Sequence, residues 1–275
     1  MKIDSHQHFW NYNAERDNWI DESMSVIKKD FFPEDLYPIL KKNNIHGCVA
    51  IQANQSEEET HFLLDLAKQY SFIKGVVGWI DLCDKNVEKR IAYFNKNKLL
   101  KGFRHIIQTE KEDFLLQKEF KNGMRQLGDF KLTYDLLILP NQLNAAIKLV
   151  SLFPDQIFIL DHLAKPKISE PLESNWVNHI KILATHSNVM CKISGMVTET
   201  EKFNWNQTDF IPFLDTITNA FGVDRLLFGS DWPVCLLAAS YEEVIKINNE
   251  YFKNFSKEER DKIFGENAQR IYNLD

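Results

Sequence analysis

The stretch Ile157-Phe158-Ile159-Leu160-Asp161-His162 carries the pattern on which the fold prediction rests: a short apolar run that ends in a carboxylate and an imidazole. Four consecutive large apolar residues are typical of a strand that is buried on both faces of a parallel sheet. Polar groups directly after such a strand cost free energy unless they are paired or have a function. We therefore interpret Asp161 and His162 either as a structural hydrogen-bonded pair or as part of a site at the end of this strand.

Seven other short runs of this kind are spread along the chain. The eight runs cover residues 2–6, 48–53, 75–80, 102–107, 132–138, 157–160, 189–193 and 226–228. The stretches between them read as helices: Ser56 to Glu59 form a capping box, residues 143–150 repeat apolar side chains at helical spacing, and residues 209–221 end at Gly222. Alternating strands and helices predict an α/β protein. Eight such units predict one domain, residues 1–275, folded as a (β/α)₈ barrel of the TIM type. A doubly wound open sheet is the alternative.

Length and charge agree with this reading and exclude several classes of function. The 275 residues are close to the roughly 250 of a (β/α)₈ barrel. The net charge of −6, without a basic stripe, argues against a nucleic-acid partner. No apolar run is long enough to cross a membrane, and no secretory leader pattern opens the sequence, so we expect a cytoplasmic protein. The sequence leaves the oligomeric state open.

The spacing of the cysteines does not predict a zinc ribbon or a disulfide framework. They are far apart and lack the paired spacing of either. The four are Cys48, Cys83, Cys191 and Cys235. We expect reduced and mostly buried thiols, although Cys235 stands close to a candidate site residue and a reactive thiol there is the alternative.

Charged and imidazole side chains recur at the ends of the predicted strands. His6 and His8 close the first run, and residues two apart on a strand point to the same side. Arg104 and His105 close the fourth run. Asp231 follows the eighth, directly after a glycine and a serine that permit a tight exit from the strand. Each signal is weak alone, but in a barrel the carboxyl ends of the strands converge on one pocket.

Longer stretches of the sequence resemble a known family. These are IDSHQHFW (3–10), GVVGWIDL (75–82), KGFRHIIQ (101–108), LTYDLLI (132–138), LDHLAKP (160–166), CKISG (191–195) and LLFGSDWPVCLLAASY (226–241). Together they are similar to the amidohydrolase superfamily, in particular to its sugar-lactonase branch of L-fuconolactonase and L-rhamnono-lactonase-like proteins. The resemblance implies the barrel, a lactone substrate, and His6, His8, His162 and Asp231 as site residues.

The expected activity is therefore the hydrolysis of a ring ester in a sugar lactone. The three histidines would polarise the carbonyl, and Asp231 would take a proton from the attacking water. A sugar needs further polar partners, and an aldonate product carries a carboxylate. The candidate substrate-binding residues near the strand ends are Gln52, Trp79, Arg104, His105, Lys165 and Trp232. Lys165 could equally be a solvated loop charge.

Two alternatives remain for the cofactor: the protein uses no metal, or it binds one divalent cation. Among such cations Zn²⁺ best matches the number and type of ligands offered by His6, His8, His162 and Asp231. No lysine at a strand end offers itself as a bridge between two metals, and the fifth run carries no histidine, so we do not expect a binuclear centre. Two rival functions are a metal-dependent, non-oxidative decarboxylase acting on an unsaturated acid and a sugar-binding barrel without activity. Residues 9–30, which include Trp10, Tyr12 and Trp19, form a long aromatic connection that would either cover the pocket or pack onto the barrel.

Overall fold

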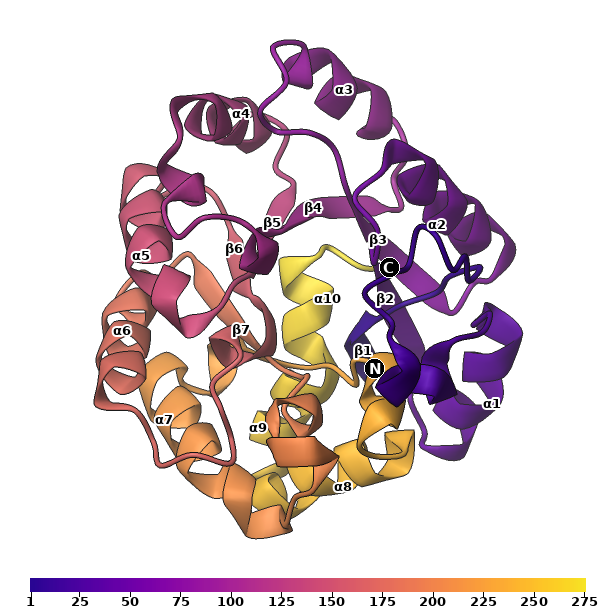
Figure 1. The fold of residues 1–275 in the computed structure, drawn as a ribbon, viewed down its shortest axis with the longest axis vertical. Helices are drawn as coiled ribbons and strands as arrows, with labels where there is room; N and C mark the ends of the chain where they lie inside the picture. The colour runs from indigo at the N-terminus through magenta and orange to yellow at the C-terminus, as the bar shows by residue number, and fades with distance from the viewer.

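The computed structural model describes residues 1–275, and its eight strands form one parallel sheet in sequential order. The strands are β1 (Ile3–Gln7), β2 (Gly47–Ile51), β3 (Ile73–Gly78), β4 (Leu100–Ile106), β5 (Thr133–Leu137), β6 (Phe158–Leu160), β7 (Val189–Ile193) and β8 (Leu226–Phe228). They form a ring with the helices around it (Figure 1). A doubly wound sheet would have a shuffled strand order, so the sequential order confirms the predicted (β/α)₈ barrel.

Ten α-helices accompany the strands. They are α1 (Pro33–Lys42), α2 (Glu57–Gln69), α3 (Val87–Phe94), α4 (Lys118–Gly128), α5 (Leu143–Leu152), α6 (Ser174–Ala184), α7 (Ile211–Phe221), α8 (Tyr241–Tyr251), α9 (Lys257–Asp261) and α10 (Asn267–Ile271). The expected caps are present: the Ser56 side chain accepts the backbone N–H of Glu59 at the start of α2, and Gly222 ends α7 with φ of 67°. No helix combines the length and the apolarity needed to cross a bilayer.

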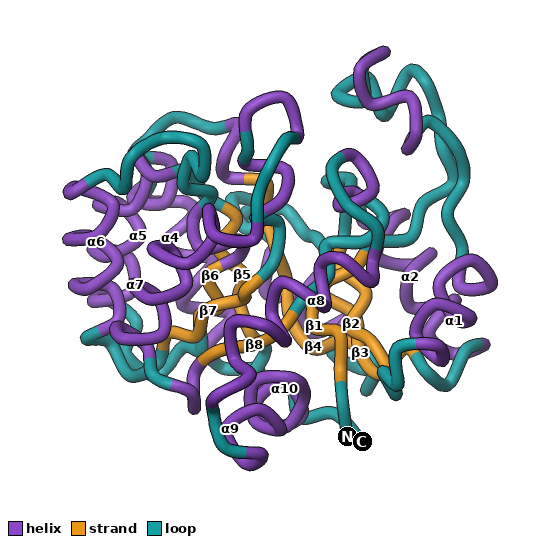
Figure 2. The backbone as a smooth tube through the Cα atoms, turned by 90° about the horizontal axis from the view of Figure 1, so that it is seen from below, coloured by secondary structure: helices purple, strands orange, loops and turns teal.

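The buried hydrophobic residues form two clusters, one outside the barrel and one in its interior. The larger contains 68 buried residues and lies mainly between the sheet and the helices. The smaller contains nine, among them Val77, Ile159 and Leu227 from the strands and Ala268 and Tyr272 from α10 and its end. Figure 1 shows α10 across the middle of the ring, and Figure 2 shows it below the strands, so α10 closes this end of the barrel. Both chain termini also lie below the strands, near α10 (Figure 2). Chemistry is thus confined to the opposite end.

The ring closes between β8 and β1 through a short seam instead of a full ladder. The backbone N–H of Asp231 donates to the carbonyl of His6 at 2.8 Å, and that of His8 donates to Trp232 at 2.7 Å. Below them the Ser5 hydroxyl donates to the carbonyl of Phe228 at 2.6 Å. The seam therefore places the residues after β8 directly beside the histidines of β1.

Candidate active site

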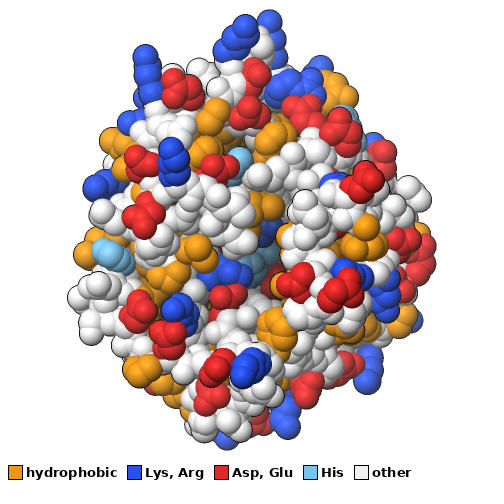
Figure 3. Space-filling model, in the orientation of Figure 1, with side chains coloured by type: hydrophobic (Ala, Val, Ile, Leu, Met, Phe, Trp, Pro, Cys, Tyr) orange, Lys and Arg blue, Asp and Glu red, His pale blue; other side chains and the backbone are white.

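A cavity of about 240 Å³ opens at the carboxyl ends of the strands. Figure 3 shows a hollow near the centre of this face, with histidine, basic and acidic side chains inside it. The cavity is lined by His8, Trp10, Trp19, Ala53, Arg104, Ile106, Gln108, Thr109, Leu137, His162, Lys165, Asp231 and Val234. The lining combines apolar side chains with a few charged and imidazole groups, which is the composition of a small-molecule site.

Asp231 lies among the three histidines that the sequence singled out. Its Oδ1 is 3.3 Å from Nε2 of His8, 3.7 Å from Nε2 of His6 and 3.9 Å from Nε2 of His162. Burial opposes the charge of Asp231, but the histidines outweigh it and hold the pKa of this carboxyl well below its usual value. The backbone of Asp231 has a φ of 59°, a conformation that non-glycine residues adopt mainly where surrounding structure imposes it. The structure thus presents an ionised carboxylate to the cavity.

His8 has a defined tautomer. Its Nδ1 lies 2.8 Å from the carbonyl oxygen of Ile51, which can only accept, so Nδ1 carries the hydrogen. In the neutral ring Nε2 then offers a lone pair to Oδ1 of Asp231 at 3.3 Å. Two acceptors that face each other at this distance require a proton or a cation between them. This is also the orientation of a metal-binding histidine whose second nitrogen is held by a carbonyl.

His162 is presented by an unusual turn after β6. Four consecutive residues, from His162 to Lys165, have φ between 51° and 59°. Nδ1 of His162 is 2.9 Å from the Ser194 hydroxyl, which orients the ring. Gly195 is required beside it, because a Cβ at that position would lie 2.4 Å from Nδ1 of His162. The segment after β7 is therefore shaped to hold this imidazole.

Arg104 is buried at the cavity and is held by groups behind it. Its Nη1 donates to Oδ2 of Asp161 at 3.0 Å, and its Nη2 donates to the side chain of Gln52 at 3.1 Å and to the Gln52 backbone carbonyl. Gln52 does not line the cavity. It is wholly buried and orients Arg104 instead.

Below the histidines lies a buried ionic cluster that the sequence reading missed. Nζ of Lys192 is 2.5 Å from Oδ2 of Asp135 and 3.0 Å from Oδ1 of Asp161, and none of the three side chains is exposed to solvent. The Tyr272 hydroxyl donates to the same oxygen of Asp135 at 2.8 Å. Burial alone would raise the pKa of Asp161, but Lys192 and the neighbouring His6 and Arg104 hold it well below its usual value. The available signal was a lysine inside the apolar run 189–193.

A second missed group, Asp4, connects the two sides of the seam. Its carboxylate accepts hydrogen bonds from the backbone and hydroxyl of Ser230, from the backbone of His6 and from the hydroxyl of Tyr241. Burial raises the pKa of Asp4 to about 6. The residue fixes the segments that carry His6 and Asp231 relative to each other.

Besides Gln52, three more of the proposed substrate-binding residues do not line the cavity. Nε1 of Trp79 donates to Nδ1 of His105 at 3.1 Å, and Nε2 of His105 is 3.0 Å from Glu110. The His105 ring stacks on Phe114, and neither His105 nor Trp79 lines the cavity. Trp232 is 1% exposed and packs against aromatic side chains of the loop after β1.

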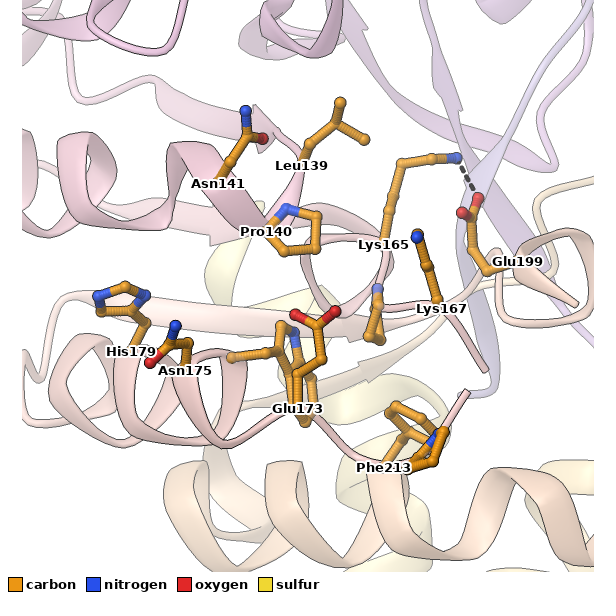
Figure 4. Close-up of a pocket in the computed structure, with 13 residues that line it drawn as sticks. Leu139, Pro140, Asn141, Lys165, Lys167, Glu173, Asn175, His179, Glu199 and Phe213 are labelled. Carbon is orange, nitrogen blue, oxygen red and sulfur yellow. Dashed lines mark ion pairs between the residues drawn. The ribbon is translucent and has the colours of Figure 1, made fainter. Parts of the chain in front are cut away.

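Lys165 does line the cavity and also borders a larger one. Its ammonium forms an ion pair with Glu199 at 2.5 Å (Figure 4). The second cavity, of about 490 Å³, lies on the other side of this pair, among the segments that precede α5 and α6. Lys165 therefore lines both cavities, whereas Glu199 lines only the larger one.

Fold and site together define a class of protein: a (β/α)₈ barrel enzyme with histidines from β1 and β6 and an aspartate from β8 at one mouth. Residues 3–274 match the amidohydrolase family. The chain belongs to this family, which confirms the resemblance seen in the sequence.

Three comparisons with known proteins narrow the position of the chain. An L-fucono-1,5-lactonase of Burkholderia multivorans is 36% identical over 286 residues, which cover all of this chain and 96% of that protein. The crystal structure of an amidohydrolase from Burkholderia multivorans with bound zinc superposes with a TM-score of 0.96 at 36% identity and covers both chains completely. A 2,6-dihydroxybenzoate decarboxylase has a TM-score of 0.72 at 12% identity, covering 99% of this chain and 98% of that one, and so shares the fold alone.

Proposed function

We propose that this chain is a lactonase that opens the ring ester of a monosaccharide lactone to the free sugar acid. The observation that carries the proposal is the ionised Asp231 surrounded by His6, His8 and His162 at the mouth of the barrel. The name of the 36% identical relative makes L-fucono-1,5-lactone the first substrate to test. The decarboxylase alternative has no comparable support, because such proteins share only the fold.

The size and lining of the cavity suit one sugar ring. A volume of about 240 Å³ lies slightly below the usual range for drug-sized ligands, roughly 300–1,000 Å³. Arg104 and Lys165 supply cationic donors for the oxygens of a lactone and for the carboxylate of its product. Ile106, Leu137 and Val234 supply apolar surface for the C–H groups of the ring.

The reaction needs a base, a hydrogen-bond donor to the carbonyl oxygen and a proton for the leaving oxygen. Asp231 accepts a proton from a water molecule as the water oxygen attacks the lactone carbonyl carbon. The imidazole groups and Arg104 stabilise the oxyanion that forms on the carbonyl oxygen. When the ring C–O bond breaks, the proton held by Asp231 passes to the departing ring oxygen. The products are one carboxylic acid and one hydroxyl on the same sugar, which balances the added water.

The donor set fits a single divalent cation. His6, His8 and Asp231 bring one ligand atom each within 4.8 Å of one another, and Nε2 of His8 faces the carboxylate at 3.3 Å. We propose that His6, His8 and Asp231 would hold such a cation, with His162 as a further candidate. When bound, a cation there would polarise the carbonyl and lower the pKa of a bound water.

A panel of sugar lactones tests the proposal directly. Purified protein is mixed with five- and six-membered aldonolactones, and acid release is followed with a pH indicator before and after treatment with a chelator. We expect hydrolysis of at least one lactone. Acid release from none of the panel, in protein loaded with zinc as well as in chelated protein, would refute the lactonase assignment.

A further inference from the structure

The side chain of Gln108 lines the cavity at the mouth of the barrel, and its amide oxygen has no partner in the protein. Gln108 lies in a single 3₁₀ turn, Ile107–Thr109, directly after β4. The unpaired oxygen is buried, which costs free energy and calls for an explanation in a native structure. The terminal torsion of a glutamine side chain is broad, so the amide can turn towards a ligand in the cavity.

The charged, imidazole and hydroxyl side chains of the same lining are all engaged with protein groups. The Thr109 hydroxyl, for example, donates to the carbonyl of Ile106 at 2.8 Å, and Nδ1 of His162 is 2.9 Å from the Ser194 hydroxyl. The engaged residues are His8, Arg104, Thr109, His162, Lys165 and Asp231. The oxygen of Gln108 is thus the acceptor that the protein leaves free beside the cavity.

The backbone that carries Gln108 is fixed from two sides. Nε2 of Gln142, a buried residue just before α5, donates to the carbonyls of Ile107 at 2.8 Å and Glu110 at 3.1 Å. The side chain of Gln55, from the loop after β2, accepts the backbone N–H of Ile106 at 2.8 Å. The turn is therefore held in place while the side chain of Gln108 is free to meet a ligand, as in a preorganised binding site.

Gln108 and Asp231 lie on opposite sides of the mouth. The eight strands follow one another around the ring in sequential order, so β4 lies opposite β8. Gln108 follows β4, Asp231 follows β8, and both line the same cavity. A lactone ring with its carbonyl carbon at Asp231 therefore presents its far side, which carries hydroxyl groups, to Gln108.

The chemistry of the lining explains why an amide is useful there. Arg104 and Lys165 only donate hydrogen bonds, and the carboxylate of Asp231 is directed at the reacting water. A sugar hydroxyl donates as well as accepts, so a ring with several hydroxyls needs acceptors in addition to these cations. A glutamine amide supplies a donor and an uncharged acceptor together.

We propose that Gln108 is a specificity-determining residue that binds a ring hydroxyl remote from the lactone carbonyl. The proposal rests on the proposed function and narrows its substrate class to polyhydroxylated lactones. A lactone without this hydroxyl leaves the amide oxygen unpaired and is a poorer substrate. Binding sites that bond a substrate hydroxyl reject analogues without it more strongly than apolar pockets reject a changed methylene.

A double-mutant cycle between the enzyme and its substrate tests the hydrogen bond. Gln108→Met removes the amide at nearly constant length and is compared with the wild type on three substrates. These are the lactone that is hydrolysed fastest, its analogue lacking the hydroxyl remote from the carbonyl, and its analogue lacking the hydroxyl at C2. The matched control is Gln69→Met, at an exposed glutamine at the end of α2, and urea midpoints establish that each variant is folded.

With the full lactone we expect Gln108→Met to lose about 10-fold to 100-fold in kcat/KM, in line with one hydrogen bond between buried groups. The loss should appear mainly in KM, because the remote hydroxyl does not change during the reaction. With the analogue lacking the remote hydroxyl the loss should shrink at least fivefold, and with the analogue lacking the C2 hydroxyl it should persist. Equal losses on all three substrates, no loss, or a loss tied to the C2 hydroxyl would overturn the proposal.

Binding of sugar acids separates this proposal from the lactonase assignment. If the wild type hydrolyses no lactone, the same cycle is measured by calorimetry with the corresponding polyhydroxylated sugar acid and its remote deoxy analogue. We expect Gln108→Met to bind the full acid about tenfold more weakly than the wild type, with a smaller difference for the deoxy acid. A wild type that does not bind the acid, or a variant that binds it equally well, would overturn the role of Gln108.

Discussion

The carboxylate of Asp4 accepts both hydrogens that Ser230 can offer, from the backbone N–H at 2.9 Å and from the hydroxyl at 2.6 Å. Asp4 belongs to β1, and Ser230 directly precedes Asp231. The contact therefore fixes the segment after the last strand to the first strand at the point where the ring closes. Its geometry is transmitted to Asp231 through a single peptide unit.

Ser230→Ala removes the hydroxyl from this contact. The hydroxyl also accepts the backbone N–H of Trp232 at 3.0 Å, so two buried groups lose a partner. We expect a loss of about 1–3 kcal/mol in the free energy of unfolding, measured in urea. The lactonase kcat should fall with KM nearly unchanged, because Asp231 loses its position and the substrate-binding residues do not. Ser151→Ala, an exposed hydroxyl on α5, is the matched control and should change neither quantity.

Asp231→Asn tests the base. Asparagine keeps the shape and can still hydrogen-bond, but it cannot take a proton from water at neutral pH. We expect kcat to fall by about 10²–10⁴-fold, the usual contribution of general-base catalysis, with a smaller change in KM. Asp155→Asn, an exposed carboxylate in the segment before β6, should retain full activity. A folded Asp231→Asn protein with more than about a tenth of the wild-type kcat would assign the proton transfer to another group, His162 first.

The Lys165–Glu199 pair is expected to control substrate affinity. Lys165→Met removes a cationic donor from the cavity and should raise KM about tenfold or more, since hydrogen bonds to charged groups contribute roughly 1.5–3 kcal/mol. Glu199→Gln releases the same ammonium from its partner and should lower KM. Lys167→Met is the control, because Lys167 is exposed and pairs with Glu170. Identical kinetics of the two methionine variants would show that Lys165 is only a loop charge.

Trp19→Ala tests whether the loop after β1 takes part in binding. The Trp19 ring lines the cavity, is 44% exposed, and meets the edge of the Trp10 ring at a centroid distance of 6.3 Å. Loss of a ring contact with the sugar should raise KM about threefold to tenfold, in line with roughly 0.5–1.5 kcal/mol for an aromatic contact. Trp19→Phe should recover most of the affinity. An unchanged KM in a folded alanine variant would mean that Trp19 only packs the loop.

Glu59 predicts a pH dependence of stability. Its carboxylate accepts the backbone N–H of Ala53 at 2.5 Å, and burial raises its pKa from 4.5 to about 7. Between these values the folded chain keeps a proton that the unfolded chain has released, so this contribution to stability falls as the pH rises through the window. Its full size is on the order of 3 kcal/mol.

Glu59→Gln should remove this dependence, because glutamine does not ionise. The measurement is the urea midpoint at pH 5 and pH 8 for the wild type, for Glu59→Gln and for Glu58→Gln, an exposed neighbour on the same turn. The urea midpoint of the wild type, taken relative to that of Glu59→Gln, should be higher at pH 5 than at pH 8. A difference that is equal at both pH values would contradict the raised pKa.

The barrel could be predicted from the sequence because each strand is an apolar run that is followed by polar or turn-forming residues. The bounds shifted by one to a few residues: the third run was expected at 75–80, and β3 spans Ile73–Gly78. It ends there because the backbone of Trp79 turns to bond with the side chain of Thr60. Such a side chain, supplied from α2, has no signature in the run itself.

The four principal candidate residues stood out in the sequence because they lie at the carboxyl ends of strands, where the geometry of a barrel brings them together. The interior charges were missed because a residue inside a strand faces either the barrel or the helices, and the sequence does not say which. Arg104 and His105 illustrate this: neighbours on a strand point to opposite faces, and only Arg104 reaches the cavity. Lys192 and Asp135 are charged residues in apolar runs, and their partners come from other strands and from the end of α10.

The left-handed turn from His162 to Lys165 constrains how this sequence can change over generations. Each such residue costs an L-amino acid roughly 1–2 kcal/mol, and glycine avoids the cost. Leu163 and Ala164 are nevertheless wholly buried, and burial of a leucine side chain contributes about 1.5–3 kcal/mol. Glycine at Leu163 would relax the backbone and leave a void, and any larger side chain at Ala164 would have to be accommodated in the buried interior. We therefore expect far fewer substitutions to be tolerated in these four positions than on the exposed helices, so variation in this turn should be slow to accumulate.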